Sequence, residues 1–273
     1  MATATRQIRL THPRLWQRVS TLMWARRALW LWLLLPVLIY AMFRRGIGIP
    51  LAMVSIFLSL TVAKSLSVWE QSLRRQFVRD AALPKFLVDK LIAAHPQLKR
   101  GDAELVLRGL RQFFMAYLRS GRQFVGMPSK VVDTAWHDFI LHTQAYALWC
   151  DSAFGKLLHH TPAEVLKSND AKRNDGLRRT WYWACKEESI DPRNPTRLPL
   201  LFALDRKFGI EGGFRYEANC KSIGQASNSG SYCGSDFSSS DSGASGDSNG
   251  LGGSESSSGS GDGGSDGGGC GGD

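Results

Sequence analysis

The sequence predicts an all-α protein with an N-terminal transmembrane helical hairpin, a helical cytoplasmic domain and a disordered Gly/Ser-rich tail. Three observations support this class. Two long uncharged runs lie near the start of the chain, apolar residues recur three and four apart through its middle, and Gly and Ser dominate its end. The predicted parts are a basic start over 1–27, the hairpin over 28–64, the helical domain over 65–216 and the tail over 217–273.

Charge is distributed unevenly along the 273 residues. The formal net charge is +10, but the tail alone carries −7, so residues 1–216 carry +17. A basic body is typical of nucleic-acid binding. However, no acidic residue precedes Glu70, and arginines that flank apolar segments more often set topology and contact anionic headgroups. We therefore expect a lipid bilayer as the partner in preference to nucleic acid, and a protein partner stays open.

The two uncharged runs, 28–43 and 46–63, predict the hairpin, with its turn at Arg44–Gly46. Each is close to the lower limit of the roughly 17–25 residues that a membrane-crossing helix needs. Basic residues are more numerous outside the two runs than in the turn, which predicts an integral protein of the cytoplasmic (inner) membrane with both termini in the cytoplasm. A buried, re-entrant or interfacial hairpin remains an alternative, because both runs are short and Pro36 would kink the first.

Helical spacing and capping signals predict the elements of the domain. In order they are Ser65–Asp80 continuing the second run, a short helix opened by Pro84, a helix capped by Asp102 and ended by Gly121, a long helix from Ser129 to about Cys150, a helix capped by Asn174 or Asp175, and Leu198–Phe208. Residues 161–164 have the form of a capping box with Pro at the first helical position. These elements predict one all-helical domain.

Four of the six histidines fall between positions 137 and 160. If the chain folds back after Gly155, the side chains that meet include three histidines and a cysteine. These candidate metal ligands are His137, Cys150, His159 and His160. Neutral imidazole and thiolate suit zinc or iron, and Asp133, one helical turn before His137, would orient that ring from the second coordination sphere.

A purely structural reading of the same residues stays open. Cys150 lies within an apolar stripe, where cysteine usually packs as a small hydrophobe. The residue after His137 is Asp138, whereas a zinc-protease helix has a glutamate there. The sequence therefore favours a binding or scaffold module over a metal-dependent, hydrolytic enzyme, and it assigns no catalytic residue.

One run of residues resembles the core signature of the glycine-rich-domain-containing-protein-like family, and within it bacterial members without an assigned activity. The run is Val132-Asp133-x-x-Trp136-His137-x-x-Ile140-x-x-Thr143-x-x-Tyr146-x-x-x-Cys150-x-x-x-Phe154-Gly155-x-x-x-His159-His160-x-Pro162. The similarity continues through Arg197–Asp205 and Gly213–Tyr216 into the tail, and covers about residues 100–273.

The resemblance implies an architecture and a set of candidate residues, without a reaction. Its motif core is Trp136, Tyr146, Phe154 and Gly155, which would order the fold or a ligand pocket around the histidines. Tails in this family are richer in Cys than this one, which is dominated by Ser, Gly and Asp. The difference weakens any role for Cys220, Cys233 and Cys270.

Overall fold

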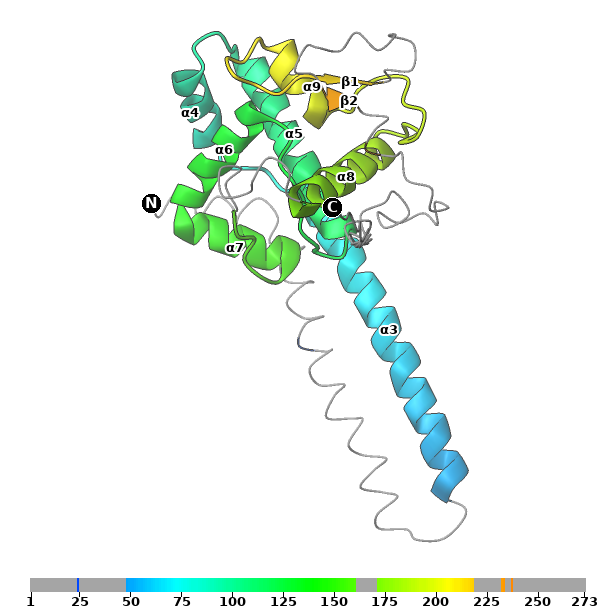
Figure 1. Cartoon of the computed structure of the whole chain (residues 1–273). Coiled ribbons are helices and arrows are strands. Elements are labelled where there is room, and N and C mark those ends of the chain that lie inside the picture. Colours follow the sequence, from blue (N-terminus) through cyan, green and yellow to red (C-terminus); the bar gives the residue numbers. More distant parts are fainter. Residues whose placement is uncertain (1–23, 25–47, 161–170, 219–231, 234–236, 238–273) are drawn as a thin grey trace, which may run out of the picture.

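The computed structural model describes residue 24 and residues 48–160, 171–218, 232–233 and 237 (Figure 1). Its helices are α3 (Gly48–Asp80), α4 (Phe86–Ala94), α5 (Arg100–Arg119), α6 (Lys130–Leu141), α7 (Thr143–Phe154), α8 (Ala171–Glu187) and α9 (Leu200–Lys207). Two strands of two residues each, β1 (Tyr216–Glu217) and β2 (Tyr232–Cys233), pair in parallel. Apart from this short pair, the regular secondary structure of the described residues is helical, which confirms the all-α class.

Helix α5 lies at the centre of the domain and contacts α3, α4, α6, α8 and α9 (Figure 1). A helix that is apolar on all sides is found in a protein interior. The second half of α5 is such an interior segment, since every residue from Gln112 to Leu118 is buried and all but Gln112 are apolar or aromatic. Phe113 and Phe114 on this stretch pack their rings against Trp136 of α6, and Phe114 also packs against Trp149 of α7. The core is therefore an aromatic cluster built around α5.

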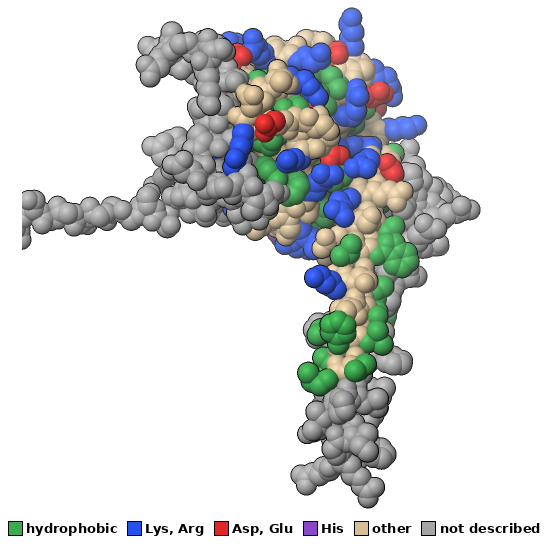
Figure 2. Space-filling view, turned by 90° about the vertical axis from the view of Figure 1, so that its right-hand side faces the viewer, with side chains coloured by type: hydrophobic (Ala, Val, Ile, Leu, Met, Phe, Trp, Pro, Cys, Tyr) green, Lys and Arg blue, Asp and Glu red, His purple; other side chains and the backbone are tan. Residues whose placement is uncertain are grey.

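Helix α3 has two halves with different surroundings. Its second half enters the domain, where Leu73, Phe77 and Val78 are buried. Its first half projects away from the domain as an arm (Figures 1 and 2). We define the apolar arm by its exposed large side chains, which are Met53, Val54, Phe57, Leu58, Leu60 and Val62. The predicted continuation of the second uncharged run into Ser65–Asp80 is confirmed.

Among the residues that the structure describes, no helix is both long and apolar enough to cross a membrane. This finding corrects the prediction that residues 46–63 form a second membrane-crossing helix. From Gly48 onward this segment is the first half of α3, a short apolar run that continues into the charged and partly buried second half of the same helix. The predicted first span, 28–43, lies outside the described residues, as does all of the basic start except Trp24.

The predicted long helix from Ser129 to about Cys150 is wrong, because it is interrupted at His142, which separates α6 from α7. His142 leaves helical geometry, with φ −89° and ψ 61°. Its ring stacks on Phe86 of α4 with centroids 3.8 Å apart, and its Nδ1 lies 2.9 Å from the carbonyl oxygen of Asp138. A break of one residue leaves the spacing of apolar residues almost unchanged, so the pattern does not reveal it.

Other predicted helix ends agree in part with the structure. Ser129 is the N-cap of α6, and its hydroxyl accepts the backbone N–H of Val132 at 3.4 Å. Asp102 accepts the backbone N–H three residues before it at 3.0 Å, from a position inside the first turn of α5. Helix α8 begins at Ala171, so neither predicted capping residue stands at its start. The capping box at 161–164 lies outside the described residues.

The predicted boundary of the tail at residue 217 is too early. Glu217 belongs to β1, and β2 is formed by two tail residues. Phe237 packs its ring against Trp181, Phe202 and Tyr216, with centroids 5.8 to 6.2 Å apart. The average composition of the tail conceals these isolated aromatic residues. The rest of 219–273, with Cys220 and Cys270, lies outside the described residues.

Candidate functional site

The helix that carries the candidate site is fixed at its start by a distant carboxylate. Asp205 of α9 is buried, and its two oxygens accept four hydrogen bonds. The donors are the Ser129 hydroxyl at 2.7 Å and the backbone N–H groups of Lys130, Val131 and Phe214 at 2.8 to 3.1 Å. A negative charge at a helix N-terminus complements the helix dipole. Asp205 therefore sets where α6 begins.

The chain reverses direction after α7 at Gly155. This residue has φ 73° and ψ 8°, a left-handed conformation that favours glycine, and its N–H donates to the carbonyls of Cys150 and Asp151. A Cβ at this position would stand 2.9 Å from Nη2 of Arg74. Phe154, just before the turn, is buried against Phe114, Tyr117 and Trp149. The predicted reversal after Gly155 is confirmed.

Arg74 secures this turn from α3. Its Nη1 donates to the carbonyls of Asp151 and Ser152 at 2.8 and 2.9 Å, and its Nε donates to Glu70 at 2.9 Å. The Arg74 side chain is only 1% exposed. Arg74 is one of the basic residues that follow the second uncharged run, and its charge is paired with Glu70 inside the domain.

The segment that follows the turn is tied back to α6 by two linked hydrogen bonds. The indole Nε1 of Trp136 donates to the Tyr146 hydroxyl at 3.1 Å, and that hydroxyl donates to the carbonyl of Leu158 at 2.6 Å. Burial raises the pKa of Tyr146 well above its usual range, so the phenol keeps the proton that it donates. The Trp136 ring also meets His160 edge-on, with centroids 4.6 Å apart. His160 is thereby held beside α6.

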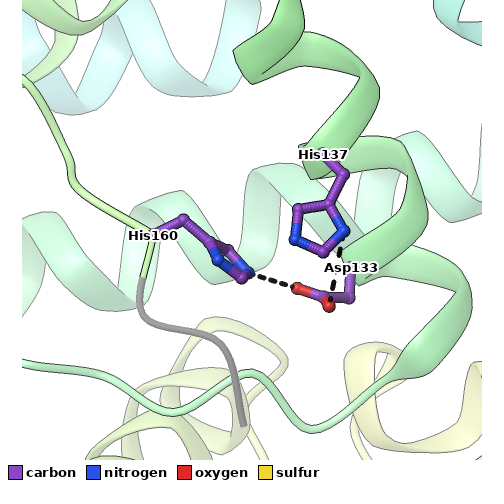
Figure 3. Close-up of side chains that lie close together, drawn as sticks. All are labelled: Asp133, His137 and His160. Carbon is purple, nitrogen blue, oxygen red and sulfur yellow. Dashed lines mark hydrogen bonds and ion pairs between the residues drawn. The ribbon is translucent and has the colours of Figure 1, made fainter. Parts of the chain in front are cut away.

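Asp133, His137 and His160 form the candidate site (Figure 3). Asp133 and His137 are one turn apart on α6, and His160 approaches from the opposite side. Nε2 of His160 lies 2.9 Å from Oδ1 of Asp133, and Nδ1 of His137 lies 3.8 Å from Oδ2. The two imidazole centroids are 4.3 Å apart. One ligand atom from each residue lies within 4.8 Å of the other two, an arrangement that can hold a metal ion.

Two of the four predicted ligands, His137 and His160, lie together in this cluster. Asp133, predicted as a second-sphere partner of His137, contributes a carboxylate oxygen to the same cluster. Cys150 is fully buried outside the cluster, and burial raises the pKa of its thiol to about 11. Because it lies outside the cluster and is fully buried, Cys150 packs as a small apolar core residue. His159 is exposed and does not belong to the cluster.

A cavity of about 590 Å³ adjoins the cluster. Asp133 and His160 belong to both the cluster and the cavity wall. The wall is partly aromatic, and it contains three cationic residues, namely Arg122, Lys130 and Lys156. Asp133 is the one acidic residue among the described residues that line it. A ligand pocket around the histidines was one alternative that the sequence left open, but the residues of its wall come from short stretches in separate parts of the chain, so the sequence does not identify them.

A comparison with known protein families matches this sequence to the UCP032817-like family over residues 73–237, more than half of the chain. The chain belongs to this family. The UCP032817-like match begins at Leu73, where α3 enters the core, and ends at Phe237, the last aromatic residue that packs on it. It includes the whole cluster and cavity and leaves out the apolar arm.

The UCP032817-like match assigns a family and no activity. No curated protein and no solved structure matches the chain significantly. The resemblance to glycine-rich-domain-containing proteins stays a prediction.

Proposed function

We propose that this chain is a membrane-tethered binding protein whose helical domain holds a small anionic ligand in the cavity beside Asp133 and His160. One observation carries the proposal, namely the size and charge of that cavity. A volume of about 590 Å³ falls within the roughly 300–1,000 Å³ typical of small-molecule sites. Such sites combine apolar and aromatic walls with a few charged groups that orient the ligand.

The wall favours an anion with a flat apolar part. Phe113, Tyr117 and Trp136 supply aromatic surface, and the three cationic residues exceed the single acid. A wall with this balance raises the local concentration of negatively charged ligands. A carboxylate or phosphate group on an aromatic body combines the two features that the cavity recognises.

Charge reversal tests this ligand class. The full chain is titrated with phenyl phosphate and with benzoate, using their neutral counterparts phenol and benzamide as matched ligands. We expect binding of the anions alone, and a several-fold weaker affinity in Lys156→Glu. Lys90→Glu, an equal charge change at an exposed position of α4, should bind like the wild type. Equal weakening in the two variants, or equal binding of phenol and phenyl phosphate, would refute the proposal.

The tether is assigned to the apolar arm of α3. Phe57 is 70% exposed and Val54 65%, and large exposed apolar patches mark interaction sites with proteins or membranes. A lipid surface is favoured because no acidic residue precedes Glu70, because the uncharged run 28–43 lies just ahead in the sequence, and because basic residues accompany both.

A second candidate function is a metal-dependent hydrolase. It is favoured by the cluster itself, because two histidines and one carboxylate leave coordination positions open for water and substrate. This candidate predicts that the full chain, with added Zn²⁺ or Fe²⁺, hydrolyses activated phosphate and carboxylate esters. The activity should be abolished in His160→Ala. Rates equal to those of the variant would exclude it for these substrates.

A further inference from the structure

We infer that Asp133, His137 and His160 form a binding site for a divalent transition metal ion, with Asp133 as a direct ligand, and that the open positions of the ion take the anionic group of the ligand in the cavity. The metal site stands on the geometry of the cluster alone. Its connection to a ligand deepens the proposed binding function and rests on it.

The spacing of the three side chains fits a small ion. Zinc bonds to nitrogen and oxygen are about 2.0–2.1 Å long, so tetrahedral geometry places two ligand atoms about 3.3 Å apart. The distances from His160 Nε2 to Asp133 Oδ1, 2.9 Å, and from His137 Nδ1 to Asp133 Oδ2, 3.8 Å, lie on either side of that value, although they end on different oxygens of the carboxylate. Each oxygen of the carboxylate faces a different imidazole (Figure 3). Small side-chain rotations therefore bring the three ligand atoms onto one ion.

The ligands are held in place from two independent directions. Asp133 and His137 are fixed by α6, whose start is capped by Asp205. His160 is fixed by the hydrogen bonds that join Trp136, Tyr146 and the Leu158 carbonyl. A site that is ordered before its ion arrives loses less conformational entropy on binding.

The donor set selects the class of ion. Two imidazoles and one carboxylate suit zinc or ferrous iron, and both leave one or more positions open at such a site. Calcium and magnesium prefer sites made wholly of oxygen ligands. The structure thus points to a divalent transition metal with access to an additional ligand.

The open coordination positions of the ion can be filled by the anionic group of the ligand in the cavity. Asp133 and His160 line the cavity as well as the cluster, so an ion bound to them lies at its wall. The ion would add positive charge to a wall that already contains Lys130 and Lys156. A carboxylate or phosphate group can contact the ion and these cations together.

Metal titration of the full chain tests the site. The protein is treated with chelator and titrated with Zn²⁺ by calorimetry, with metal content measured separately and the fold of each variant checked by circular dichroism. We expect one ion per chain. Loss of a group that only orients a metal ligand costs about 10–100-fold in affinity, so Asp133→Ala, His137→Ala and His160→Ala should each lose more than that.

His159→Ala is the matched control, because His159 is the adjacent histidine and lines the cavity without belonging to the cluster. It should bind zinc like the wild type. Absence of stoichiometric binding in the wild type, or an equal loss in His159→Ala and His160→Ala, would overturn the metal site. A loss within the 10–100-fold range in Asp133→Ala alone would overturn its assignment as a direct ligand.

The connection to the ligand is tested on the Co²⁺-loaded protein. Visible absorption of Co²⁺ responds to its coordination, so acetate and inorganic phosphate should change the spectrum with saturation. An unchanged spectrum would overturn the connection while the zinc result stands. Anion binding that persists unchanged in metal-free protein would likewise separate the proposed cavity function from the ion.

Discussion

Asp205 links the end of the domain to the helix that carries the site. Four donors converge on its carboxylate, and three of them belong to the start of α6. This contact joins the two segments that continue the family resemblance, Arg197–Asp205 and Gly213–Tyr216. Asp205 stands in the first and Phe214, one of its donors, in the second. The sequence shows the carboxylate but not which helix it caps.

Removal of this carboxylate should destabilise the domain strongly. Each buried donor that loses its partner costs about 1–3 kcal/mol, so Asp205→Ala should lower the free energy of unfolding by about 3 kcal/mol or more. Asp89→Ala removes an exposed carboxylate on α4 and should change it by no more than about 0.5 kcal/mol. Urea denaturation measures both, and a similar small change in the two variants would contradict the capping role.

Gly155 combines a left-handed backbone with close contact to Arg74. A non-glycine residue in this conformation costs about 1–2 kcal/mol, and the added methyl group would also displace the buried guanidinium. Gly155→Ala should therefore destabilise more than Gly209→Ala, because Gly209 has a similar φ of 59° but no atom within 4 Å of the added Cβ. Thermal unfolding compares them. Equal decreases in melting temperature would show that the contact with Arg74 contributes nothing to stability.

At the scale of the elements, helices were easier to predict than their ends. The apolar spacing identified the positions of α4, α5 and α9, and the Ser129 cap of α6 is confirmed. The break at His142 was missed because it depends on a ring that stacks from α4, a contact between distant parts of the chain. That break places Cys150 on α7, a different helix from the one that carries Asp133 and His137.

The apolar arm of α3 gives an element-scale prediction. A charge in the middle of its exposed face opposes insertion into the apolar part of a bilayer. Phe57→Asp combined with Leu58→Asp should therefore lower the fraction of full-length protein that floats with vesicles of neutral and anionic phospholipid several-fold. Leu141→Asp is the control, since Leu141 is 72% exposed on the domain rather than on the arm. Equal flotation of all three proteins would remove the arm from the tether.

For the whole molecule, the sequence predicted the helical class and the approach of His137 to His160, because the turn at Gly155 leaves a local signal. It did not predict that Asp133 contacts both imidazoles, that Cys150 and His159 lie outside the cluster, or which residues line the cavity. Each of these depends on how distant segments pack. The role of each basic residue likewise depends on where it lies in the fold. Arg74 is paired in the core, whereas Lys130 and Lys156 line the cavity.

The central claim is that an anionic ligand occupies the cavity beside the cluster, and the indole N–H resonances of the full chain test it most directly. Trp136 lines the cavity, whereas Trp181 does not, is fully buried and donates its indole N–H to the Pro192 carbonyl. On titration with phenyl phosphate, the Trp136 resonance should shift with saturation while that of Trp181 stays in place. A Trp136 resonance that does not move, or one that moves equally with phenol, would contradict the account.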